Sequence, residues 1–197
     1  MMDNTKHWID AWLPEWQFEE VHQVRSVATP ARLMDAAAAY RPDDDRMIGA
    51  ALALRESPGR LAGLLGLGGA LAGRPRFGKA DFLPLGRLGN QALAYGLVGS
   101  FWQPGYGLVR LPDAAAFCAY STPGVAKLML SFEASTDGKA ATRITTMSRL
   151  HCPDAATRRR VAVYWALIRP VSGLIRGRML RQIRRVAEAP EAAEAVA

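Results

Sequence analysis

The residues best suited to chemistry are few and widely spaced. His151 and Cys152 are adjacent potential metal ligands, but a zinc site needs three or four donors, and neither the other histidines nor Cys118 lie at a helpful spacing. We therefore predict no metal site. Cys152 instead precedes Pro153 and Asp154, where the last predicted strand passes into a helix whose positive dipole end favours an acidic residue.

The sequence also lacks the usual nucleotide-binding and acyl-transfer motifs. The glycines between residues 66 and 73 resemble a dinucleotide loop, but Leu71 replaces the third Gly or Ala of G-x-G-x-x-G. We interpret this segment as a flexible pocket flap or a packing helix. No Ser or Cys lies in a signature such as G-x-S-x-G, so we predict no catalytic residue and no cofactor. Acid–base chemistry by Glu20, His22 or His151 stays open, because residues distant in sequence can meet in a fold.

The strongest structural pattern is at the C-terminal end. Residues 155–188 predict one long amphipathic helix, since apolar residues recur every three or four positions, the repeat of one helical face. Pro170 removes a backbone hydrogen bond inside this helix, so we expect a kink there. The apolar positions are Val161, Tyr164, Ile168, Val171, Ile175, Met179, Ile183 and Val186.

The preceding residues predict strands and short helices that would position this long helix. We expect strands at 18–27, 47–56, 82–85, 91–102, 125–133 and 141–150, and an extended piece ending at Leu111. Short helices are expected at 29–40, 57–73 and 113–121, the first because Thr29-Pro30 is a helix start. In the strand 125–133, Leu128, Leu130 and Phe132 share a dry face and the alternate residues a wet one. The fold class is therefore α+β, a curved antiparallel sheet wrapped around a long C-terminal helix.

Length and composition favour a single domain over residues 1–188, with 1–16 as an N-terminal extension and 189–197 as a disordered tail. Two cysteines are too few for a disulfide framework, and the first residues lack the apolar core of a secretory signal. The longest apolar stretch, 61–73, is shorter than the ~20 residues of a membrane span. We therefore expect a cytoplasmic protein.

Positive charge is concentrated in the predicted long helix. Residues 155–197 hold nine Arg against three Glu, so about +6 of the formal net charge of +7 lies there. Arg178, Arg181 and Arg185 share one side of the helix. They indicate either a solvated outer face or a surface for anionic membrane lipids. Aromatic residues do not interleave with these arginines, so we expect no nucleic-acid partner.

Several segments together resemble a known superfamily. The run TTMSRL, the stretch 154–188, GLVGSFW and FCAYSTPGVAK are similar to a bacterial subgroup of the START-like helix-grip (SRPBCC) superfamily, which also includes polyketide cyclase and dehydrase-like proteins. The resemblance implies a seven-stranded antiparallel sheet that grips the long helix over a hydrophobic cavity. It implies no fixed catalytic set. Met147 stands where the subgroup often has an acidic residue, so no role can be carried over to that position.

These patterns predict binding of a small or medium hydrophobic molecule, lipid-like or polycyclic, between the sheet and the C-terminal helix. Alternatives are a cyclase, dehydratase or hydrolase that uses the same cavity, and a non-catalytic protein that docks on an anionic membrane or an acidic partner through its arginines. We expect Arg143, Arg149 or Thr146 to orient the ligand. The expected apolar lining is Tyr95, Phe101, Trp102, Leu128, Leu130, Phe132, Tyr164, Trp165 and Ile168.

Overall fold

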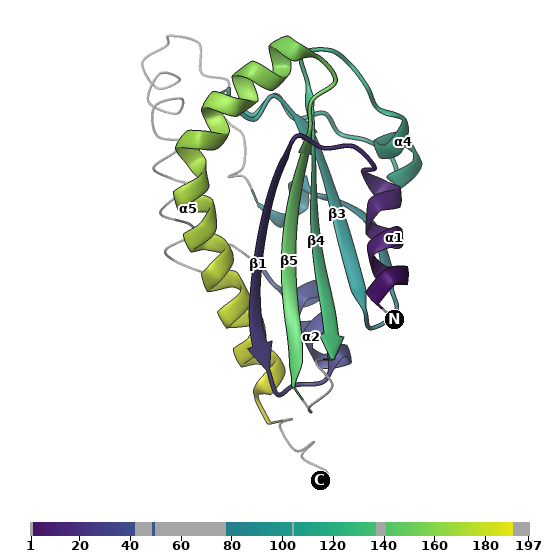
Figure 1. Cartoon of the computed structure of the whole chain (residues 1–197), viewed down its shortest axis with the longest axis vertical. Coiled ribbons are helices and arrows are strands. Elements are labelled where there is room, and N and C mark those ends of the chain that lie inside the picture. The colour runs from purple at the N-terminus through teal and green to yellow at the C-terminus, as the bar shows by residue number, and fades with distance from the viewer. Residues whose placement is uncertain (1, 42–48, 50–77, 104, 137–140, 191–197) are drawn as a thin grey trace.

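The computed structural model describes residues 2–41, 49, 78–103, 105–136 and 141–190, and has an α+β architecture. Its strands form one curved antiparallel sheet of five in the order β1-β5-β4-β3-β2 (Figure 1). The resemblance implied seven strands; five belong to this sheet within the described residues, and the predicted strand 47–56 lies almost wholly outside them. The strands are β1 Phe18–Ser26, β2 Leu83–Leu88, β3 Ala92–Gly99, β4 Ala126–Thr136 and β5 Thr142–His151.

Helices cover both faces of this sheet. The long helix α5 (Ala155–Glu188) and the short helix α2 (Pro30–Ala39) pack on one face, whereas α1 (Met2–Trp12) and α4 (Ala114–Ala119) pack on the other (Figure 1). A short 3-10 helix, η2 (Lys79–Asp81), precedes β2. The sheet therefore lies between two helical layers, with the longest helix along one side.

The ends of the predicted helices are set by local sequence, and the long helix has the predicted bounds. Asp154 caps α5 by accepting a hydrogen bond from the Thr157 backbone nitrogen at 2.8 Å, and its side chain also accepts from Gly124. The same arrangement starts α2, where the Thr29 hydroxyl accepts from Arg32 and Pro30 occupies the first turn. Pro170 lies inside α5, which continues through it without a break in helical structure.

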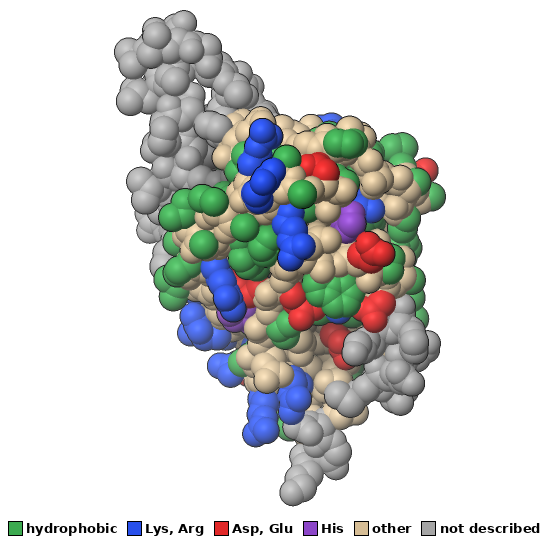
Figure 2. Space-filling model, turned by 45° about the horizontal axis from the view of Figure 1, so that its top comes forward, with side chains coloured by type: hydrophobic (Ala, Val, Ile, Leu, Met, Phe, Trp, Pro, Cys, Tyr) green, Lys and Arg blue, Asp and Glu red, His purple; other side chains and the backbone are tan. Residues whose placement is uncertain are grey.

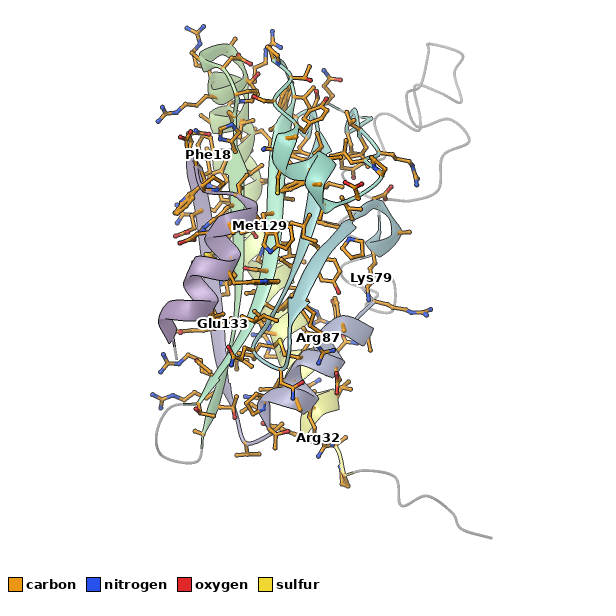
Figure 3. The ribbon with its side chains drawn as sticks, turned by 90° about the vertical axis from the view of Figure 1, so that its right-hand side faces the viewer. Phe18, Arg32, Lys79, Arg87, Met129 and Glu133 are labelled. Atoms are coloured by element: carbon orange, nitrogen blue, oxygen red, sulfur yellow. The ribbon has the colours of Figure 1, made fainter. Side chains whose placement is uncertain are left out.

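Strand alternation divides the side chains of β4 between the two faces. Leu128, Leu130 and Phe132 point toward α5. Met129 has the opposite parity and lies on the side of α1 (Figure 3). The prediction that the other face of β4 is wet was wrong. Ser131 on that face is only 1% exposed, because α1 and α4 cover this side of the sheet.

Two segments differ from their sequence-based predictions. The strand predicted over 91–102 ends at Gly99, where the chain turns and Tyr106 packs back on it; a Cβ at Gly99 would lie 2.7 Å from the Tyr106 carbonyl oxygen. A single antiparallel bridge joins Val98 to Val109, in the predicted extended piece. The residues treated as an N-terminal extension contain α1, and the predicted helix 57–73 lies outside the described residues.

Buried apolar residues on the α5 side of the sheet form two separate clusters. We name them the α2 cluster, at the C-terminal end of α5, and the Val161 cluster, at its N-terminal end. The α2 cluster includes Leu33, Met34, Phe132, Ile144, Leu180 and Ile183. The Val161 cluster includes Leu97, Phe101, Ala126, Leu150, Cys152 and Val161. The sheet face under α5 is thus not filled by one continuous core.

Candidate functional site

A cavity of about 680 Å³ lies between the sheet and α5. Strands β3, β4 and β5 form its floor and α5 forms one wall, while α2, residues 78–82 and the turn after β3 close other sides. Its position coincides with the gap between the two clusters, since partly buried members of both face it: Tyr95 and Leu130 from the α2 cluster, Leu128 and Trp165 from the Val161 cluster. The space exists because α5 spans the sheet without packing tightly on its middle.

Most of the predicted apolar residues meet at this cavity. They come from β3, β4, α5 and the turn after β3, segments that are far apart in sequence. Because strand alternation points Leu128, Leu130 and Phe132 to the same side, all three form part of the floor. The predicted residues that line the cavity are Tyr95, Phe101, Leu128, Leu130, Phe132, Tyr164, Trp165 and Ile168.

Arg143 and Arg149 were expected to orient the ligand, but both lie on the face of the sheet opposite the cavity. Alternation along β5 places them with Met147, whereas Thr146 faces α5. Arg149 is only 3% exposed, and its guanidinium lies 3.5 Å above the Trp16 ring. This residue holds the chain before β1 against the sheet and does not reach the cavity.

Two other predicted residues lie near the cavity without lining it. Trp102 is half-buried, follows Phe101 in the turn after β3 and packs against the Val161 cluster. Thr146 is fully buried beneath α5, and its hydroxyl accepts a 3.5 Å hydrogen bond from Arg176, which does line the cavity.

Arg176 is the functional candidate that sequence reasoning missed. It is one of the nine arginines that the sequence concentrates in the C-terminal helix, and it lies four residues after Ser172 and three before Met179, both of which also line the cavity. That spacing places it on the inward face of α5 and was visible in the sequence. Burial lowers the pKa of its guanidinium to about 10, although the charge of Glu20 opposes this shift, so Arg176 stays a cation at neutral pH.

A polar row beneath α5 accompanies Arg176. The carboxylate of Glu20 bonds His22 Nε2 at 2.8 Å and accepts from the Ser172 hydroxyl at 2.9 Å. Gly173 lets α5 approach Glu20 closely, because a Cβ at this position would crowd a Glu20 oxygen at 3.3 Å. Ser148, between Glu20 and Leu130 in the sheet, is fully buried, and its hydroxyl has no hydrogen-bond partner within the described chain.

The titratable groups named as acid–base alternatives do not line the cavity. Glu20 and His22 instead border a separate depression between β1 and α5. Its α5 side includes Arg169, Pro170 and Gly173. His151 projects from the opposite face of β5, and burial lowers its pKa. The described lining of the cavity contains tyrosines but no His, Asp or Glu.

The described residues also offer no metal site, no membrane-spanning helix and no activated thiol. No group of three or more His, Cys, Asp or Glu side chains there is arranged to hold a metal ion. No helix among these residues has both the length and the apolar character needed to cross a bilayer. Cys118 and Cys152 are both free thiols, and burial raises the pKa of Cys152 to about 11, which makes it a poor nucleophile at neutral pH.

Comparison with known proteins gives no family assignment. No protein-family model matches the chain, and no curated protein or solved structure is significantly similar to it. Functional inference therefore depends on the cavity and its lining.

Proposed function

We propose that this chain is a START-like helix-grip protein that binds a small or medium hydrophobic molecule, lipid-like or polycyclic, between the sheet and α5. The observation that supports this most is the cavity of about 680 Å³ with its mainly aliphatic and aromatic lining. Its volume lies within the roughly 300–1,000 Å³ of small-molecule sites. Affinity would come from apolar surface removed from water, at about 25 cal/mol per Å².

The enzymatic alternative has weaker support. A cyclase, dehydratase or hydrolase needs a positioned general acid or base close to its substrate. In the part of the lining that the structure describes, the polar side chains are tyrosines, Ser172, Lys79 and Arg176, and burial raises the pKa of Tyr95, which keeps its hydroxyl neutral. This set is better suited to orienting a ligand than to abstracting a proton at neutral pH.

Partly filling the cavity should weaken binding. Ile168 lines the cavity from α5, so Ile168→Trp is expected to lower the affinity for the uncharged fluorescent probe N-phenyl-1-naphthylamine by about tenfold or more, equal to at least about 1.4 kcal/mol. The matched control is Val163→Trp, on the same helix but 66% exposed, which should bind the probe like the wild type. Fluorescence titration gives the affinities. Equal affinity in all three proteins would contradict the proposal.

A second candidate function, docking on an anionic membrane, is favoured by the outer face of α5. Val163, Leu167 and Leu174 are 66%, 75% and 64% exposed and share one helical stripe, because their spacing is four and seven residues. Arg178, Arg181 and Arg185 continue this stripe toward the C-terminal end. Figure 2 shows basic side chains among apolar ones on this side of the molecule. Such a helix face fits a bilayer surface containing anionic lipids.

Removing the basic part of this stripe should weaken membrane binding. The variant Arg178→Gln/Arg181→Gln/Arg185→Gln is expected to partition about 100-fold less onto phosphatidylcholine vesicles that contain phosphatidylserine, at ~1 kcal/mol per arginine. Co-sedimentation at low ionic strength measures this. A control that removes three exposed arginines elsewhere, Arg25→Gln/Arg41→Gln/Arg110→Gln, should lose much less. Equal, negligible binding of the wild type to vesicles with and without phosphatidylserine would exclude this function.

A further inference from the structure

The charged groups that the described residues place on the cavity wall are all of one sign. Lys79 and Arg176 line the cavity, and no Asp or Glu does so within the described lining. Lys79, labelled in Figure 3, already donates from Nζ to the Ala38 carbonyl oxygen. A lysine ammonium has three donors, so both cations can still bind an acceptor, but only Arg176 offers a planar guanidinium with parallel N–H groups.

The hydrogen bonds of Arg176 are incomplete. Its Nη1 makes one long bond of 3.5 Å to Thr146, and its buried Nε has no partner among the described residues. Glu20 is the nearby acid, but its two oxygens are engaged by His22 and Ser172. A buried guanidinium with unused donors is suited to a planar oxygen acceptor that takes two parallel hydrogen bonds.

We propose that the cavity ligand is a long-chain carboxylate whose head group binds the Arg176 guanidinium and whose chain lies along α5. This inference rests on the proposed function, because it specifies the chemistry of the ligand in the same cavity. A single planar guanidinium matches a singly charged carboxylate, and the positive lining disfavours a cationic head.

The shape of the cavity fits the rest of such a molecule. Arg176 and Tyr164 lie twelve residues apart on α5, which corresponds to about 18 Å at 1.5 Å per residue. Between them the helix wall is apolar except for Ser172, whose hydroxyl already donates to Glu20, and Trp165 and Phe101 lie toward the far end. An extended alkyl chain would therefore contact aliphatic and aromatic groups along this length while its head stays at Arg176.

Matched ligands test the head-group assignment. Tetradecanoic acid, tetradecan-1-ol and methyl tetradecanoate are used at neutral pH to displace N-phenyl-1-naphthylamine from the wild type, Arg176→Gln and Arg176→Lys. We expect the acid to bind the wild type about tenfold more tightly than the alcohol or the ester, and Arg176→Gln to lose that preference while keeping its affinity for the alcohol. Arg176→Lys should keep part of the preference. The control Arg159→Gln removes the same charge from an exposed position on α5 and should bind like the wild type.

The outcomes distinguish the carboxylate assignment from the proposal that the cavity binds hydrophobic molecules. Equal displacement by acid and alcohol in the wild type, or an unchanged preference in Arg176→Gln, would overturn the carboxylate assignment and leave hydrophobic binding in place. Absence of probe binding to the wild type would instead overturn the proposed function together with this inference. Probe binding to each variant reports an intact cavity, and if Arg176→Gln does not fold, the wild-type preference and Arg176→Lys decide the question.

Discussion

Phe117→Ala is expected to destabilise the protein by about 3–5 kcal/mol, the range for removing a large aromatic side chain from a core. Phe117 is completely buried between α4 and the sheet face opposite α5. Its ring lies against the backbone of Gly96, where an added Cβ would come within 2.7 Å of a ring carbon. Lys127 Nζ lies 5.5 Å from the ring centroid, so truncation also leaves a buried ammonium without this neighbour.

Denaturant unfolding followed by circular dichroism measures this loss of free energy. Val27→Ala, at a position that is 83% exposed, is the control and should change stability by less than about 0.5 kcal/mol. Gly96→Ala should destabilise the wild type through its clash with the ring, and should cost less in the Phe117→Ala background, where that clash is removed. Additive effects of the two changes would show that the ring does not pack on Gly96.

Arg149→Met should destabilise the fold by about 2–3 kcal/mol. Its Nε donates to Glu19 at 2.9 Å and its Nη1 donates to Asp10 on α1, so the change leaves two neighbouring carboxylates without their shared cation. Removing one partner of a fully buried pair costs about 3–5 kcal/mol. We expect less here, because the side chains of Asp10 and Glu19 are 31% and 35% exposed and water screens them.

A charge-neutral background provides the control for this second variant. Adding Asp10→Asn and Glu19→Gln to Arg149→Met should recover part of the lost stability, since no unpaired carboxylate then remains. Thermal unfolding of the wild type, Arg149→Met, Asp10→Asn/Glu19→Gln and the triple variant gives the coupling energy between the arginine and the two carboxylates. If the triple variant is no more stable than Arg149→Met, the arginine stabilises mainly by its contact with Trp16, 3.5 Å from the guanidinium.

The elements with local signals could be predicted from sequence. Residues 155–188 combine a capping Asp154 with a sustained helical repeat, and the helix has those bounds. Thr29-Pro30 likewise identified the start of α2. The N-terminal helix was missed, although Trp8 and Trp12 are one turn apart, as are Ile9 and Leu13. This apolar pattern covers less than two turns of helix. Its side chains are buried only by packing on the sheet face opposite α5, which the local sequence does not reveal.

The candidate site was predictable where alternation and periodicity sufficed. Leu128, Leu130 and Phe132 share a parity in β4 and all line the cavity. Arg143 and Arg149 have the opposite parity to Thr146 in β5, so the sequence already excluded a common face for all three in a regular strand. Which of the two faces lies under α5 depends on strand pairing, and this is not encoded in any short segment. Arg176 was missed because its residue type was weighed more than its helical position.

The location of a bound probe tests the central claim most directly. Isotope-filtered nuclear Overhauser spectra of the complex with N-phenyl-1-naphthylamine, recorded on methyl-labelled protein, report which side chains touch the ligand. We expect contacts to the methyl groups of Leu128, Leu130 and Ile168, which line the cavity, and none to Leu85 or Met129 on the other sheet face. Contacts only to Leu85 and Met129, or only to exposed methyl groups such as that of Val163, would contradict a binding site between the sheet and α5.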